Sequence, residues 1–78
     1  MDDNFQAALQ RLRDCAQRTQ EAAARVTLKR SEIALIEARN GSTDVARSVL
    51  AFLERVLAQH CDCLETLIEH VENLCRGE

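Results

Sequence analysis

The chain has 78 residues, enough for one domain, and a monomer of that size buries a thin core unless a disulfide, a metal or a second chain stabilises it. It contains no Pro, Trp or Tyr and few Gly or Phe, a composition that argues against a sheet protein, which needs frequent turn and aromatic residues. The net charge of −3 provides no general attraction to nucleic acid or anionic lipid, and no apolar run approaches the roughly 18 residues of a membrane span. These properties predict a small all-α protein.

The first predicted helix covers about residues 4–40. Asp3, followed three residues later by Gln, has the spacing of a capping box, so we expect the helix to begin near Asn4. The next stop signal is the Asn-Gly pair at 40–41, where Gly41 is expected to adopt the left-handed conformation beyond the helix end. The acidic start leads directly into an amphipathic pattern, unlike a secretory signal, and predicts a cytoplasmic protein.

The second predicted helix covers about residues 43–76, after a turn at 41–42. Ser42 or Thr43 is expected to cap its first turn, and Gly77 supplies the stop at its other end. Two helices of about 35 residues joined by so short a connection must lie side by side and antiparallel. The sequence therefore predicts one domain, an antiparallel two-helix hairpin.

The apolar residues of the second helix cover about half of its circumference. One neighbouring helix covers a narrower stripe, so a second neighbour is needed, and a dimer of hairpins forming a four-helix bundle provides it. The domain covering 1–78 is thus expected to form a homodimer or a higher oligomer. The residues predicted for its dimer interface are Val49, Phe52, Leu53, Val56, His60, Leu64, Leu67 and Val71.

The first helix is apolar on two sides after Val26. Its main face continues through Ile33, but Arg30 and Glu37 fall at the border of that face. Either a partner protein docks on the second side, or the helix kinks and buries these residues in its own dimer. The residues of this predicted partner-binding seam are Ala24, Leu28, Leu35 and Ala38.

Charge is divided unevenly between the two helices. Residues 11–30 are rich in Arg, whereas residues 59–75 carry four acidic residues and no Lys or Arg. An antiparallel hairpin places these segments side by side, so we expect ion pairs between them to support the hairpin. The four acidic residues are Asp62, Glu65, Glu69 and Glu72.

His60 is the polar residue nearest the centre of the apolar arc of the second helix. It is expected to be a buried neutral histidine that helps to fix the register of a dimer, or alternatively to form a pH-sensitive interface. A third reading is a metal ligand: Cys63 is one turn away, and two such pairs across a dimer axis would supply two Cys and two His ligands to a zinc ion. No cofactor is otherwise indicated. Cys15 and Cys75 are expected to be reduced thiols that fill the core.

No arrangement of residues indicates an enzyme. Arg30 and Glu37 are about two turns apart with no implied pocket, and an interface ion pair explains them more simply. The sequence favours a small non-enzymatic protein–protein interaction module of the adaptor, inhibitor or chaperone type. A nucleic-acid-binding regulator that uses the basic side of the first helix is an alternative, and a dimer stabilised by metal through His60 and Cys63 is another.

The hairpin layout resembles that of small dimeric RNA-binding regulators of plasmids and of the small helical co-chaperones of type III secretion. The resemblance covers length and layout and involves no shared motif. It assigns no functional residue, because a shared fold does not imply a shared function. The protein-binding module is expected to be of a bacterial or phage regulatory type because of its excess apolar helix surface and small size.

Overall fold

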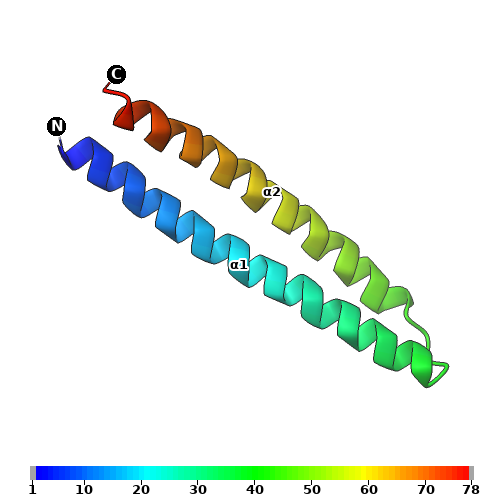
Figure 1. Cartoon of the computed structure of the whole chain (residues 1–78). Coiled ribbons are helices and arrows are strands. Elements are labelled where there is room, and N and C mark those ends of the chain that lie inside the picture. The colour runs from blue at the N-terminus through cyan, green and yellow to red at the C-terminus, as the bar shows by residue number, and fades with distance from the viewer. Residues whose placement is uncertain (1, 78) are drawn as a thin grey trace.

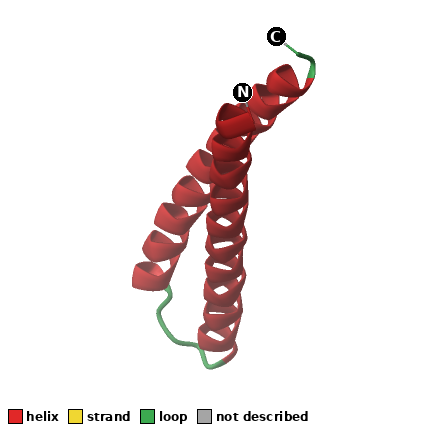
Figure 2. Ribbon diagram, turned by 90° about the vertical axis from the view of Figure 1, so that its left-hand side faces the viewer, coloured by secondary structure: helices red, strands yellow, loops and turns green. Residues whose placement is uncertain are grey.

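The computed structural model describes residues 2–77, which form two helices packed side by side. Helix α1 spans Asp2–Ala38 and helix α2 spans Asp44–Cys75, and no strand is present in this part of the chain. The helices run antiparallel as a rod whose Cα atoms extend over 59 × 14 × 14 Å (Figure 1). Figure 2 shows that their axes are inclined to one another. The predicted all-α hairpin is confirmed, and neither helix has a stretch that is both long and apolar enough to cross a membrane.

The two helices meet along a seam in which shielded residues alternate at spacings of three and four. This is the heptad spacing of helices that pack along a shared stripe. In α1 the seam residues are Phe5, Ala8, Leu12, Cys15, Thr19, Ala22, Val26, Lys29, Ile33 and Ile36. In α2 they are Ala46, Leu50, Leu53, Leu57, His60, Leu64, Leu67, Val71 and Leu74.

The seam pairs small side chains on α1 with large ones on α2. The buried core consists of Ala8, Cys15, Ala22, Val26, Ile33 and Val71, so five of its six residues belong to α1. Small residues let the helices approach closely, and the longer Leu side chains of α2 cover them. Those Leu residues are themselves half-buried. The hairpin therefore buries little apolar surface, as expected for a chain of this length.

Helix α1 ends in a Schellman motif that differs from the prediction at one residue. Asn40, rather than Gly41, has the left-handed conformation, with φ 59°. Asn is the non-glycine residue that most readily adopts it, because its side chain bonds locally. The amide of Gly41 then donates to the carbonyl of Ile36 at 2.9 Å, and the amide of Asn40 donates to that of Glu37 at 3.0 Å. The connection covers residues 39–43 and is longer than the predicted turn.

The other helix ends agree with the sequence to within a few residues. Helix α1 begins at Asp2, so Asp3 lies inside its first turn, where its charge favours the helix dipole, and not at the predicted cap. Thr43 is the N-cap of α2, but its hydroxyl accepts a bond from Arg47 Nε at 2.9 Å and makes no cap bond to the backbone. Gly77 is left-handed, with φ 81°, and is the predicted stop.

Gly41→Ala is expected to destabilise the hairpin by about 1 kcal/mol, the scale of an overpacked contact. A methyl group at Gly41 would lie 2.9 Å from Ile36 Cγ2, and the β-branched Ile side chain cannot easily rotate away. Urea unfolding followed by circular dichroism measures the change. The control is Ser42→Ala in the same exposed loop, expected to change stability by less than about 0.5 kcal/mol. Equal midpoints for both variants would contradict this account of the turn.

Candidate interaction surface

The antiparallel seam divides the hairpin into two flanks with different chemistry. In an antiparallel helix pair, the residues that come one position after a seam residue lie on the same flank for both helices. The residues that come one position before a seam residue lie on the opposite flank. On the first, the ion-pair flank, Arg30 Nη2 lies 2.8 Å from Glu54 Oε2, and Arg47 pairs with Glu37. On the other, the open flank, Arg11 and Arg18 of α1 lie beside His70 and Cys63 of α2.

The predicted pairing of the basic stretch of α1 with the acidic stretch of α2 is wrong. Among the described residues, the ion pairs between helices are the two near the hairpin tip, Arg30–Glu54 and Glu37–Arg47. The predicted acids are all exposed, and their spacing of 3, 4 and 3 places them on the side of α2 opposite the seam. The antiparallel hairpin therefore brings the two charged segments to the same height along the rod, but their charged side chains do not face one another.

Arg30 and Glu37, at the border of the main face of α1, are each explained by a partner on α2. Their side chains and those of Glu54 and Arg47 are 45–62% exposed, so each pair contributes modestly to stability. Lys29 lies within the seam itself and is bonded to Glu32 at 2.8 Å. These polar residues narrow the apolar contact between the helices close to the tip.

Large exposed apolar side chains lie on the open flank, in the half of the rod nearest the connection between the helices. Leu28 and Leu35 are 67% and 61% exposed, and heptad position places them on the same side of the hairpin as three apolar residues of α2. The five form the tip patch: Leu28, Leu35, Val45, Val49 and Phe52. Ile68 is the sixth exposed large apolar residue that the structure describes.

The tip patch combines parts of two surfaces that the sequence analysis separated. Val49 and Phe52 came from the predicted dimer interface, and Leu28 and Leu35 from the predicted partner-binding seam. Ala24 and Ala38 of that seam are also exposed, on a helix that runs without interruption from Asp2 to Ala38. Five residues of the predicted dimer interface lie in the contact between α1 and α2 within one chain: Leu53, His60, Leu64, Leu67 and Val71. The eighth, Val56, is half-buried on the open flank.

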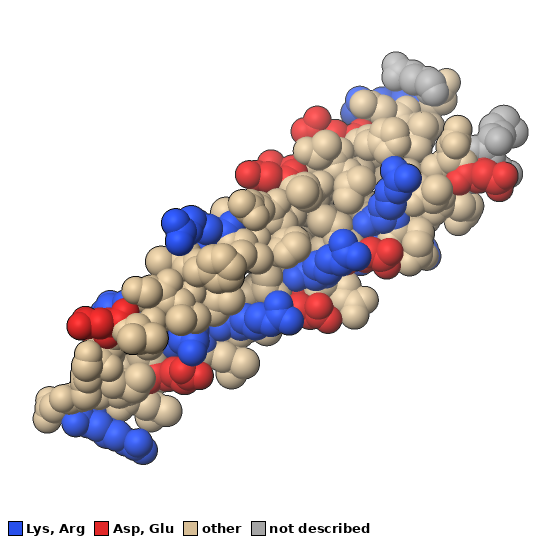
Figure 3. Space-filling view, turned by 180° about the vertical axis from the view of Figure 1, so that it is seen from behind, with Lys and Arg blue, Asp and Glu red and all other residues tan. Residues whose placement is uncertain are grey.

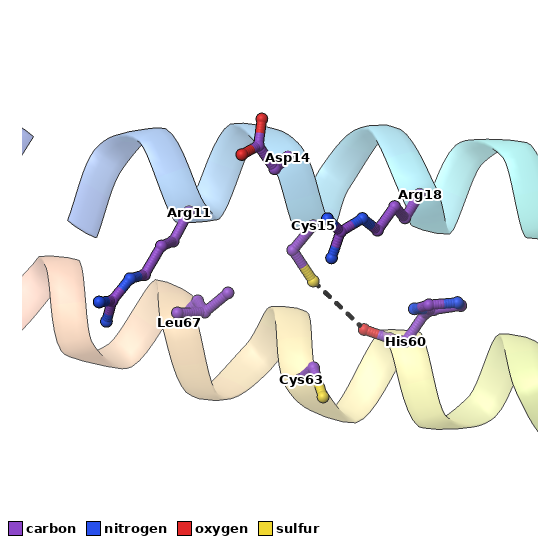
Figure 4. A pocket seen from close by; sticks show the side chains of 7 residues that line it. All are labelled: Arg11, Asp14, Cys15, Arg18, His60, Cys63 and Leu67. Atoms are coloured by element: carbon purple, nitrogen blue, oxygen red, sulfur yellow. Dashed lines mark hydrogen bonds between the residues drawn. The ribbon is translucent and has the colours of Figure 1, made fainter. Parts of the chain in front are cut away.

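His60 lies half-buried in the seam, at one end of a groove of about 420 Å³ on the open flank. The thiol of Cys15 donates to its backbone carbonyl at 3.8 Å, which joins α1 to α2 through the main chain (Figure 4). The imidazole ring and the thiol of Cys63 point in different directions in this view. Within residues 2–77 no three potential ligands gather around a metal position. The metal-bound dimer stays a hypothesis about two chains.

The four cysteines are all free thiols, but they do not share one environment. Cys15 is buried in the seam, as predicted for a core residue. Cys75 is exposed, so its predicted place in the core is wrong. It is the last residue of α2 and lies on the ion-pair flank, next to the seam residue Leu74.

A second apolar area, smaller in side-chain exposure, lies on the ion-pair flank near the chain termini. Ile68 is 40% exposed there, and a groove of about 690 Å³ lined by Ala16, Thr19 and Leu64 lies beside it. Arg13 and Gln20 form the polar edge of this groove. We call Leu9, Ala16, Leu64, Ile68 and Cys75 the terminal patch. Sequence periodicity did not predict this patch as a separate surface, because its residues fall within the apolar faces expected to form the core.

Comparisons with protein-family models, curated proteins and solved structures found no match to the chain.

The pair Arg30–Glu54 is expected to show a coupling energy below about 1 kcal/mol in a double-mutant cycle, because both side chains are substantially exposed. The cycle compares Arg30→Gln, Glu54→Gln and the double variant by urea unfolding. A coupling of several kcal/mol would show that the ion-pair flank is buried in the native assembly, and would contradict its exposure in a single chain.

Proposed function

We propose that this protein is a non-enzymatic protein–protein interaction module that acts as an oligomer of helical hairpins. The observation that carries the proposal is the distribution of apolar surface. The core of one chain consists of six residues, of which three are Ala or Cys on alternate turns, whereas five large apolar side chains gather exposed on one flank. A chain this small gains its missing stability by covering such surface with another chain.

Self-association is assigned to the terminal patch. Its polar edges carry Arg13 on α1 and Glu65 on α2, so a second copy that faces this patch can bring opposite charges together. The half-buried Leu64 would contact α1 and the second copy at once, as seam residues do in a four-helix bundle, whereas Val71 is already buried within one chain. This arrangement keeps Leu64 of the predicted dimer interface and leaves the tip patch free.

Wild-type protein is expected to sediment as a dimer or larger species at micromolar concentration. Ile68→Glu places a charge within the terminal patch and should shift the protein toward monomer, with a loss of stability because the isolated hairpin has a thin core. The matched variant on the same helix is Phe52→Glu, in the tip patch, which should leave the oligomer intact. A wild type that is a stably folded monomer would remove the oligomer from the proposal. Dissociation by Phe52→Glu and not by Ile68→Glu would move the dimer interface to the tip.

The tip patch is assigned to a partner protein. Replacing Leu28 and Leu35 together with Gln is expected to leave the melting temperature of the hairpin within a few degrees of wild type, since both side chains are exposed. The same double variant should lose the partner captured by wild-type protein from a lysate of its source organism and identified by mass spectrometry. Ile33→Gln, at a buried seam position between them, is the control and should unfold the chain. A large loss of stability in the double variant would instead place Leu28 and Leu35 within the oligomer.

A further inference from the structure

A row of arginines runs along the open flank of α1 toward the tip patch. Arg11, Arg18 and Arg25 are seven residues apart, so they occupy one heptad position and follow one another at steps of about 10 Å. All three are exposed, and no described carboxylate forms an ion pair with them. Figure 3 shows Lys and Arg side chains in a row along one helix, beside a broad uncharged surface. We call these three residues the arginine row.

The hairpin supplies no counter-charge to this row from its other helix. The α2 side of the open flank consists of residues 45, 49, 52, 56, 59, 63, 66, 70 and 73, and none of them is Asp, Glu, Lys or Arg. On the ion-pair flank, by contrast, α2 provides Glu54 and Arg47 to α1. The fold thus pairs the charges between its helices on one flank and leaves cations facing outward on the other.

The carboxylates closest to the row in sequence are Asp14 and Glu21, which lie on its outer edge on α1. Each accepts a hydrogen bond from a Gln four residues earlier: Asp14 from Gln10 at 2.9 Å and Glu21 from Gln17 at 3.5 Å. These two carboxylates lower the net positive charge of the flank but form no ion pair with the arginine row. The guanidinium groups keep their donors for another molecule.

Arg11 and Arg18 border the groove that contains His60 (Figure 4). The Arg11 side chain extends toward α2, and the Arg18 side chain runs along α1 toward Cys15. Asp14, Cys15, Cys63 and Leu67 also line the groove, and the Asp14 carboxylate points away from α2. A carboxylate on an aliphatic stem fits such a groove, since its methylene groups contact the apolar lining while its oxygens accept from a guanidinium. Glu and Asp side chains have this chemistry.

The arginine row and the tip patch together form one continuous face, cationic toward the termini and apolar toward the tip. A strip with the dimensions of the rod, 59 by 14 Å, has an area of roughly 800 Å², the area that each partner buries in an interface of standard size. We therefore propose that this face binds an amphipathic helix of another protein, whose apolar residues cover the tip patch and whose Asp and Glu residues lie on the arginine row. The inference rests on the proposed protein-binding function and adds the charge and the shape of the partner.

Two other occupants fit less well. A parallel second copy on this flank would bring one arginine row against another, and an antiparallel copy would place each row on an apolar tip patch, which has no carboxylate to pair with it. The terminal patch, by contrast, offers opposite charges. A nucleic acid or an anionic membrane would satisfy the row, but Asp14, Glu21 and Glu32 lie along the same side of α1, and the chain carries a net charge of −3. RNA would also leave the tip patch uncovered.

The test uses two synthetic helical peptides of four heptads with fluorescent labels. Both carry Leu at the seam positions of the first two heptads; the following two heptads carry Glu in the acidic peptide and Lys in the basic peptide at the positions facing the row. Fluorescence anisotropy with full-length protein should show binding of the acidic peptide that weakens as salt is raised, and at least ten-fold weaker binding of the basic peptide.

Protein variants then assign the binding to the face. Replacing Arg11, Arg18 and Arg25 with Gln should weaken binding of the acidic peptide about ten-fold and remove most of its salt dependence, since each exposed ion pair contributes modestly. Arg55→Gln, on the side of α2 away from the face, is the control and should have no effect. Equal binding of both peptides, no effect of the triple variant, or no binding of either peptide would overturn the inference.

The same experiment separates this inference from the proposed function. If both peptides bind equally and the Leu28 and Leu35 double variant abolishes binding, the tip patch binds protein but the arginine row does not select an acidic helix. If single-stranded RNA or vesicles of anionic lipid bind through the arginine row more tightly than the acidic peptide, the row serves phosphate groups and the inference fails.

Discussion

The close approach of the two helices along one seam is the constraint on which the rest of the structure depends. Ala8, Cys15 and Ala22 are small enough for α2 to approach α1, and the larger side chains of α2 then cover them. The same complementarity limits the core, because small residues bury little surface and the Leu residues that cover them stay half-exposed. A rod of two helices has no third element to cover the remainder, so its stability and its binding surfaces depend on the same side chains.

The seam also determines what each flank offers. Near the tip, the ion-pair flank is closed by charges that meet between the helices, and toward the termini it carries the apolar terminal patch. The open flank has the reverse order, with an apolar tip patch and a cationic half. Each flank therefore presents one apolar half and one charged half, at opposite ends of the rod. In the proposed assembly, these two apolar halves contact two different neighbours without competition between them.

Several polar residues that the structure describes have structural partners. Arg30 and Glu37 form ion pairs that join the two helices. The Thr43 hydroxyl accepts a hydrogen bond from Arg47 at the start of α2, and the main-chain carbonyl of His60 accepts one from the Cys15 thiol. The surface is distinguished by two neighbouring features. The arginine row forms no ion pair with a described residue, and the exposed side chains of Leu28 and Leu35 lie beyond its end. Selectivity for an acidic helix is the property that this combination supports best.

Much of the fold follows from the sequence alone. The periodicity of apolar residues predicted two long helices, and the Asn-Gly pair predicted the position of the turn. The width of the apolar arc on the second helix predicted more apolar surface than one neighbouring helix covers. Each of these features depends on residues that are close together along the chain. The tertiary structure decided the rest. It placed the left-handed residue at Asn40, where the helix ends with the amide of Gly41 donating to the carbonyl of Ile36. It turned the acidic stretch of α2 away from α1, and it brought Leu28 and Phe52 to one flank. These results depend on how each helix is rotated about its own axis relative to the other. That rotation is set by the packing of the seam residues of α1 against those of α2.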